Sequence, residues 1–301
     1  GLRLANLWSR SSTSDTTSHR FLFMQGDLRG QARVGPVRVA GSLGVLEGPA
    51  HLSAITTGDN WNLVSREYWV GVDFGEETQV LLRAGRMNLP FGLRNNEHTM
   101  WVRQVPRTDI NEAQQLGLAV AVNSERWRAE GMFIAGNYQL SPDAYRERGY
   151  SAYAEYALTP HLAAGVSSLL TYTKADLVAR TPQLRQAHGL FARYSPVTPL
   201  VLMAEVDALI TTPDGGNTAG GITGLLQADY EPIQGLHFMA SGEVLQRPQA
   251  TAGTGYGGWL SAVWFFFPKL DFRIDAIVRD QDVNGSRIGS QALLTQFHAY
   301  L

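Results

Sequence analysis

Polar and apolar residues alternate along most of this 301-residue chain, and this alternation constrains the fold more than any other feature. In the segment LDFRIDAIV (270–278), Leu270, Phe272 and Ile274 share one parity, and Asp271 and Arg273 lie between them. Successive side chains of a β-strand point to opposite faces, so the segment predicts a strand with one apolar and one charged face. Helical periodicity is weak throughout. The pattern recurs at 22–34, 188–194, 201–209, 222–230 and 236–244.

Turn signals predict how these strands connect. Tight turns are expected at 35–36, 75–77, 123–125, 159–160, 195–199, 231–235 and 267–269. Longer polar connections are expected at 10–19, 48–64, 88–114, 138–147, 174–184, 212–219, 248–254 and 281–286. Short turns on one side and longer loops on the other are typical of outer-membrane barrels. The chain is therefore predicted to be a single all-β domain, residues 1–301, forming an antiparallel up-and-down β-barrel of about 16 strands with both termini on the short-turn side.

A soluble array of hairpins, such as a propeller or sandwich, is the alternative, because alternation alone does not say which face meets water. Aromatic residues discriminate between the two. A belt of aromatic side chains at one level is expected where a barrel crosses the lipid interface. The C-terminal segment LLTQFHAYL (293–301) also alternates and resembles the closing strand of such barrels. The expected location is the bacterial outer membrane, with membrane lipids as partners. The predicted interface aromatics lie beside tight turns and share the apolar parity: Phe74, Trp127, Tyr156, Tyr194, Tyr230 and Phe266.

Several other classes of protein find no support in the sequence. No apolar stretch reaches the 18 or more residues of a helical membrane span, and no signal peptide is visible at Gly1, so a mature or trimmed chain is expected. With zero cysteines, the chain has no disulfide, thiolate metal site or covalently attached c-type haem. A net charge of -2 argues against a nucleic-acid partner.

Enzyme motifs are also missing. There is no G-x-S-x-G, H-E-x-x-H or P-loop motif, and the seven histidines have no ligand-like spacing. We therefore expect no enzyme, no cofactor and no metal. A barrel hydrolase assembled from Ser, His and acidic side chains stays open, because such residues meet only in the fold.

The inward face of a barrel this wide surrounds an aqueous lumen unless something plugs it. Basic residues of inward parity are predicted on one wall: Arg29, Arg33, Arg38, Arg83 and Arg128. Acidic residues are predicted on the opposite wall: Glu205, Asp207, Asp229, Glu243, Asp271 and Asp275. There are exceptions on both walls, namely Asp27, Asp73 and Glu130 on the basic side and Arg273 on the acidic side. This segregation predicts a transverse field that sorts permeating solutes by charge. Alternatively, the charges pair across neighbouring strands and keep the lumen wet.

The segment 88–114, the third external loop, is the longest connection. Loops of this length without secondary structure are often functional, and by fold-level analogy the third loop of general porins folds into the lumen and sets the constriction. Pro90, Phe91 and Gly92 are expected to end the strand and allow the bend. A surface lid held by the same ion pairs is the alternative. The constriction candidates are Arg94, Glu97, His98, Arg103, Arg107 and Asp109.

The same segment carries a family resemblance over about 25 residues. The motif resembles a segment of porin-like barrels from deltaproteobacteria, some of which are similar to the outer-membrane sheath of porin–cytochrome electron conduits. It also resembles the AGR…PFG segment of phosphate-selective porin-like proteins. In a conduit the haems would come from a separate chain, since Cys-x-x-Cys-His is absent here, and a wider barrel would be expected. The residues that carry the resemblance are Arg83-Ala84-Gly85-Arg86, Pro90, Gly92-Leu93-Arg94, Glu97-His98-Thr99 and Arg103.

Two functions of different class follow. The first is a porin-like channel that passes small polar or charged solutes. The second is a non-conducting barrel that serves as anchor or sheath in a larger complex, such as an electron conduit or a surface-motility or adhesion machine. Association with further copies of the chain or with other envelope proteins is left open. The absence of a plug domain argues against energy-coupled import.

Overall fold

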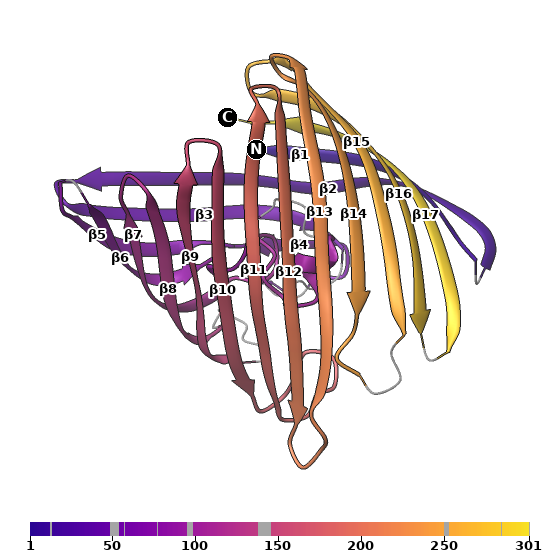
Figure 1. Ribbon diagram of the computed structural model, residues 1–301, viewed down its shortest axis with the longest axis horizontal. Helices are drawn as coiled ribbons and strands as arrows, with labels where there is room; N and C mark the ends of the chain where they lie inside the picture. Colours follow the sequence, from indigo (N-terminus) through magenta and orange to yellow (C-terminus); the bar gives the residue numbers. More distant parts are fainter. Residues whose placement is uncertain are drawn as a thin grey trace.

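The computed structural model describes residues 1–12, 14–48, 54–56, 58–76, 78–94, 99–137, 146–249, 253–283 and 285–300. In this part of the chain 17 strand segments form one antiparallel sheet. Segments next to each other in the sequence pair with each other, except that β4 (Trp61–Val64) and β5 (Tyr68–Phe74) both pair with β3 (Val37–Glu47). The last segment pairs with the first, with Leu2 opposite Ala299 and Ser11 opposite Ser290. The sheet is therefore closed, and the two termini lie close together (Figure 1).

Long strands make up nearly the whole barrel. They are β1 (Leu2–Ser11), β2 (Ser14–Val34), β3 (Val37–Glu47), β4 (Trp61–Val64), β5 (Tyr68–Phe74), β6 (Gln79–Met87), β7 (Gln115–Asn123), β8 (Trp127–Gly136), β9 (Arg148–Thr159), β10 (Leu162–Thr173), β11 (Gln183–Val197), β12 (Leu200–Pro213), β13 (Ala219–Ile233), β14 (Leu236–Gln246), β15 (Thr254–Phe267), β16 (Leu270–Val283) and β17 (Ser286–Ala299). The one helix among the described residues is α1 (Trp101–Gln104), which is too short to cross a membrane.

The segments β4 and β5 are two halves of one strand, because both pair with β3. The break between them is bridged by the Ser42 hydroxyl, which accepts hydrogen bonds from the amides of Arg66 (3.1 Å) and Glu67 (2.9 Å). Ser65 Oγ donates to the carbonyl of Ser42 at 2.8 Å. Counted by position in the sheet, the barrel thus has 16 strands, which confirms the predicted fold class.

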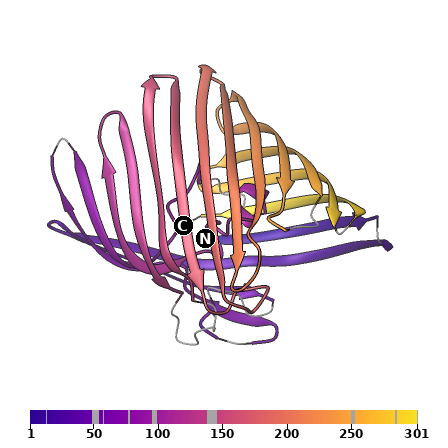
Figure 2. The same cartoon turned by 60° about the horizontal axis from the view of Figure 1, so that its bottom comes forward.

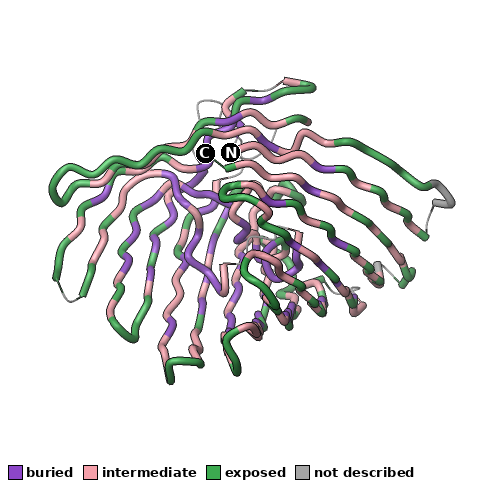
Figure 3. Tube along the Cα trace, turned by 90° about the horizontal axis from the view of Figure 1, so that it is seen from above, coloured by how far each residue is buried: buried purple, intermediate pink, exposed green. Residues whose placement is uncertain are grey.

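The two faces of the strands differ as the parity predicts. In β12, Val206 is exposed on the outside, whereas Glu205 and Asp207 are buried on the inside. Exposed and buried positions alternate in this way along the strands (Figure 3). Polar side chains are buried on the inner face, and apolar side chains are exposed on the outer face. This arrangement fits a barrel whose outer face contacts lipid.

Four of the predicted interface aromatics are exposed, namely Phe74, Trp127, Tyr194 and Tyr230. Tyr156 packs on Trp127 across the β8–β9 pair, with ring centroids 4.6 Å apart. Phe266 is partly buried, and its ring centroid lies 6.3 Å from that of Phe297.

Most connections in the described part of the chain follow the expected pattern, and residues 138–145 of one expected loop lie outside that part. The prediction of a long loop at 10–19 is wrong, because β1 continues to Ser11 and β2 begins at Ser14. The expected loop at 48–64 also departs from the pattern, because it contains β4. The expected turns at 195–199 and 231–235 are narrower, at 198–199 and 234–235, because β11 and β13 continue through register shifts. The loop bounds 88–114 agree with the ends of β6 and β7.

Candidate pore and its third loop

The described residues of loop 3 (88–94 and 99–114) lie inside the barrel. They contact inward-facing side chains of β8, β12, β14 and β16, which belong to different sides of the wall. Figures 1 and 2 show α1 of this loop within the ring of strands. Residues 95–98 fall outside the described part of the chain, so the predicted candidates Glu97 and His98 are not placed.

Arg103 ties the loop to the acidic wall. Its guanidinium forms an ion pair with Glu205 of β12, and both side chains are fully buried. The same group donates to the carbonyl of Phe91 (3.0 Å) and to Thr108 Oγ1 (3.2 Å). The other oxygen of Glu205 accepts from the amide of Leu93 at 3.0 Å. Since a buried charge is costly unless it is paired and hydrogen-bonded, Arg103 and Glu205 depend on each other.

A second contact holds the tip of the loop on β14–β16. The amide of Trp101 donates to Glu243 Oε1 at 2.6 Å, and Trp259 Nε1 donates to Glu243 Oε2 at 2.6 Å. Arg279 donates to Glu243 Oε2 (2.9 Å) and to the carbonyl of Thr99 (2.6 Å). The Arg279 guanidinium lies 5.0 Å from the Trp101 ring and 5.1 Å from the Trp259 ring, within the range of cation–π attraction.

Apolar contacts accompany these polar anchors. Leu89, Phe91 and Trp101 of loop 3 are almost fully buried in a cluster with inward-facing residues of the wall, which include Leu169 and Leu209. Met100 and Val102 form a second cluster with Leu225, Trp259 and partly buried Ile277. The loop therefore has a small hydrophobic core inside the lumen, and its docking removes apolar area from water.

The two ends of loop 3 are fastened to the break in the fourth strand. Arg66 Nε donates to the carbonyl of Asn111 at 2.9 Å. Asn88 Nδ2 donates to Glu67, and Gln114 Nε2 donates to Asn88 Oδ1 at 2.8 Å. The predicted candidate Asp109 is buried, and its carboxylate accepts the amides of Asn111 (2.9 Å) and Glu112 (2.8 Å), so it stabilises a turn of the loop.

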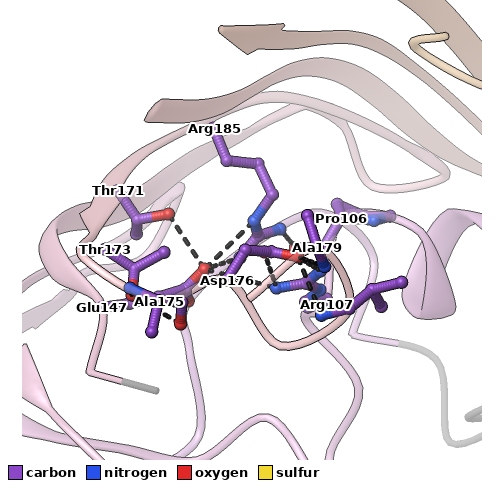
Figure 4. Close-up of polar contacts among 10 residues, drawn as sticks. Pro106, Arg107, Glu147, Thr171, Thr173, Ala175, Asp176, Ala179 and Arg185 are labelled. Carbon is purple, nitrogen blue, oxygen red and sulfur yellow. Dashed lines mark hydrogen bonds and ion pairs between the residues drawn. The ribbon is translucent and has the colours of Figure 1, made fainter. Parts of the chain in front are cut away.

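Arg107 connects loop 3 to the next external loops (Figure 4). It donates to both carboxylate oxygens of Asp176, at 2.8 and 3.2 Å. Beside it, Arg185 binds the carbonyl of Pro106 and forms an ion pair with Glu147 at 2.5 Å. Burial opposes ionisation of Asp176, but hydrogen bonds from Arg107 and from the amide of Ala179 outweigh it and lower the pKa of Asp176 to about 2.

Acid should weaken this contact only at very low pH. Because the pKa of folded Asp176 lies below its ordinary value of 3.8, the ionised carboxylate stabilises the folded loops above about pH 4, and the stabilisation, about 2 kcal/mol, is lost as the pH falls towards 2. Hydrogen exchange of loop 3 amides, compared at pH 5 and near pH 2, measures this loss. Asp176→Asn should remove it, and an unchanged pH dependence in the variant would contradict the assignment to Asp176.

Within the described part of the chain, all but one of the basic residues predicted on the first wall form an ion pair with a carboxylate. Arg29 pairs with Asp27 at 2.7 Å. Arg38 pairs with Asp73, which Arg33 approaches to 3.8 Å. Two arginines share Glu130 of β8: Arg83 of β6, and Arg94 of loop 3 at 3.2 Å. The exception is Arg128, which is exposed near the start of β8.

The acidic residues predicted on the other wall are mostly buried. Besides Glu205 and Glu243, Asp275 pairs with Arg273 at 2.8 Å and Asp271 with His298 at 2.9 Å. Asp229 is more open and lies 3.1 Å from His237 Nδ1. Asp207 is fully buried behind Gly189, where a side chain would lie 2.1 Å from its carboxylate.

Several residues of the pore were missed by sequence reasoning. Arg279 has the inward parity of β16 and could have been found from it, whereas Glu147 and Asp176 lie in loops, where no parity applies. Arg66 lies in the strand break, which no local signal predicts.

Gly92 occupies a position that only glycine fits. Its φ is +57°, and a Cβ atom there would lie 1.9 Å from Glu205 Oε1. Gly92→Ala should therefore destabilise loop docking by about 1–3 kcal/mol, through left-handed backbone strain and displacement of Glu205. Hydrogen exchange of loop 3 amides measures the change. Gly131→Ala is the matched control, since a Cβ atom there meets no atom within 4 Å; equal effects at both sites would contradict the prediction.

Solved structures of similar fold are outer-membrane proteins. The OmpT mutant lacking loop L8, from Vibrio cholerae, aligns with a TM-score of 0.70 over 98% of this chain and 97% of its own, at 8% identity. The anion-selective porin from Comamonas acidovorans has a TM-score of 0.69 over 99% of this chain and 97% of its own, at 13% identity. The outer membrane channel DcaP of Acinetobacter baumannii has a TM-score of 0.68 over 99% of this chain and 95% of its own, at 10% identity.

No family model and no curated protein matches the chain. The closed sheet and the number of its strands match these structures. The predicted location in the bacterial outer membrane is confirmed by the same likeness. The chain has the fold of porin-like outer-membrane β-barrels.

Proposed function

We propose that the chain is a passive, non-enzymatic channel of the bacterial outer membrane that passes small polar or charged solutes, and that loop 3 narrows its lumen. The observation that carries this proposal is the buried Arg103–Glu205 ion pair, which fastens loop 3 to the far wall of a closed barrel. A channel needs a wet lumen with charged lining and a fixed constriction. Charged residues of β2, β3, β6 and β8 supply the lining, and loop 3 supplies the constriction.

Charge segregation is part of the same proposal. Arginines on β3 and β6 lie across the barrel from acidic residues on β12 and β14. Asp271 and Asp275 of β16 do not lie on the opposite wall from Arg29, because only β17 and β1 separate β16 from β2. Local pairs reduce the field without removing it, because two arginines share Asp73 and two share Glu130. The local pairs support the hypothesis of pairing between neighbouring strands, and the surplus of arginine over carboxylate at Asp73 and Glu130 supports the proposed segregation.

Single-channel recording of the purified barrel in planar bilayers tests the proposal. Steady open conductance is expected from the wild-type protein. Deleting residues 93–104 should raise the conductance, because the contacts of Leu93, Trp101 and Arg103 with inward-facing residues of the wall are removed. Gly131→Ala, which changes one side chain on the wall outside the loop, should leave conductance unchanged. A wild-type barrel that inserts and stays electrically silent would contradict the channel.

A non-conducting structural barrel is the second candidate, and one observation favours it. Phe91, Trp101 and Val102 of loop 3 are at most 1% exposed and form apolar clusters inside the lumen, so part of the interior is packed like a protein core. The likeness of the loop 3 segment to deltaproteobacterial porin-like barrels would then point to a sheath or anchor in an envelope complex. A silent barrel that co-purifies with periplasmic and surface proteins supports this candidate. Self-association stays a prediction, tested by the mass of the purified barrel in detergent.

A further inference from the structure

Exposure of the charged residues in the lumen differs with their sign. On the acidic wall the side chains of Glu205, Glu243 and Asp275 are 0% exposed, that of Asp271 is 2% exposed, and that of Asp229 is 25% exposed. On the basic wall the side chains of Arg29, Arg33 and Arg38 are 54%, 59% and 28% exposed. The carboxylates of that wall, Asp27 and Asp73, are only 11% and 17% exposed. Water in the lumen therefore meets more guanidinium than carboxylate surface.

Loop 3 is one cause of this difference. It covers Glu205 with Arg103 and covers Glu243 with Trp101, and Arg279 is drawn to the same carboxylate. Nearer the start of β16, Asp275 accepts hydrogen bonds from Ser261 (2.5 Å), Arg273 (2.8 Å) and Gln296 (2.8 Å). A carboxylate that is paired and out of contact with water attracts a passing cation only weakly, because its partner cancels most of its field.

The basic wall contains a cluster of three arginines near the inner face of β2. Arg29 of β2 pairs with Asp27 at 2.7 Å, and Arg3 of β1 lies opposite Gln25, two residues before Asp27. Buried Arg66, in the strand break, interacts electrostatically with Asp27, Arg29, Arg3 and Glu112 of loop 3. Arg3 is half-buried and Arg29 is exposed. The three positive charges exceed the two negative charges of Asp27 and Glu112. At the other end of β2, Arg33 and Arg38 share Asp73, a ratio of two to one.

We propose that the lumen selects small anions, and that Arg29 and Arg3, with the charge of buried Arg66 behind them, form a binding site for these anions. This inference rests on the proposed channel and names its solute class. Guanidinium groups donate paired N–H groups that match carboxylate and phosphate oxygens, so the site suits small carboxylates and inorganic phosphate as well as chloride. The Debye length is about 10 Å at 0.1 M salt, so the exposed arginines act over much of a narrow lumen.

The reversal potential of the wild-type barrel in a gradient of potassium chloride near 0.1 M tests the inference. A surface potential of about one kT enriches chloride over potassium roughly sevenfold, and potentials of this order occur in charged clefts. We therefore expect a chloride-to-potassium permeability ratio of at least about 3. A conducting barrel with no preference, or with preference for potassium, would overturn the inference and leave the channel intact. A barrel without conductance would overturn both.

Variants of Arg29 assign the selectivity to the cluster. Arg29→Glu should lower the permeability ratio to about 1 or below, and Arg29→Gln should lower it part of the way. Because Arg29 is exposed, both variants should fold. Arg287→Glu is the control, because it makes the same change of charge on an exposed residue of β17 that pairs with Asp280 of β16. It should leave the permeability ratio unchanged. Equal shifts in Arg29→Glu and Arg287→Glu would overturn the role of the cluster.

Inorganic phosphate is the probe for binding. Added at millimolar concentration, it should reduce the chloride current of the wild-type channel by occupying the site, and Arg29→Glu should be insensitive. Block of both channels to the same extent would show that phosphate acts elsewhere and would overturn the binding site.

Discussion

Arg103→Met should weaken the docking of loop 3 by about 3–5 kcal/mol, the cost of leaving one partner of a buried ion pair uncompensated. Glu205 would stay buried with its hydrogen bond from Leu93 and without a cation. The barrel itself should remain closed, because its strand pairs do not involve Arg103. We expect loop 3 amides to exchange faster with solvent, and single channels to fluctuate between a narrow and a wide state.

A double variant separates the ion pair from other contacts of Arg103. In Arg103→Met/Glu205→Gln the buried charge is removed with its partner, and the oxygen of the introduced glutamine amide can still accept the hydrogen bond from the amide of Leu93. Replacing both members of a buried pair often costs little, so most of the lost protection should return. If the double variant were as destabilised as Arg103→Met alone, the ion pair would not be what holds the loop.

Trp101→Ala should have an effect of similar size, for a different reason. The Trp101 side chain is 1% exposed, packs in the core of loop 3 and lies over the Arg279 guanidinium. Truncation of a buried aromatic residue costs about 3–5 kcal/mol. Loosening of the loop tip should also expose Glu243, so conductance should rise and the preference for chloride should fall. Bilayer recordings measure both quantities.

Gln104→Ala is the control for this variant, since Gln104 lies in the same helix and is exposed. It should change neither conductance nor selectivity. A Trp101→Ala channel with wild-type conductance would contradict the docking of loop 3 by its apolar core.

Much of the barrel could be predicted from the sequence because lipid and water impose a strict parity on each strand. The inward parity of Glu205, Asp207 and Asp275 and the bounds of loop 3 agree with the structure. The segment 10–19 was misassigned because its residues are polar at both parities, so no alternation marks them as strand. The interruption of the fourth strand by residues 65–67 has no local signal either.

What covers the lumen-facing residues could not be predicted in the same way. Parity says that Glu205 points inward, but its partner Arg103 lies about a hundred residues away in a loop of irregular structure. The distinction between a buried and an exposed charge depends on this partner. The sequence therefore predicts which charged residues point inward, but it does not predict which of them are buried.

The break in the fourth strand has a mechanical consequence. Both ends of loop 3 are hydrogen-bonded to Arg66 and Glu67, and these two residues are held by the Ser42 hydroxyl. The loop is thus clamped at its base independently of its tip. If the contacts of the loop tip with β12 and β14 break, the loop can rotate about its base at residues 66 and 67. Substitutions at the base and at the tip should therefore change the two attachments independently.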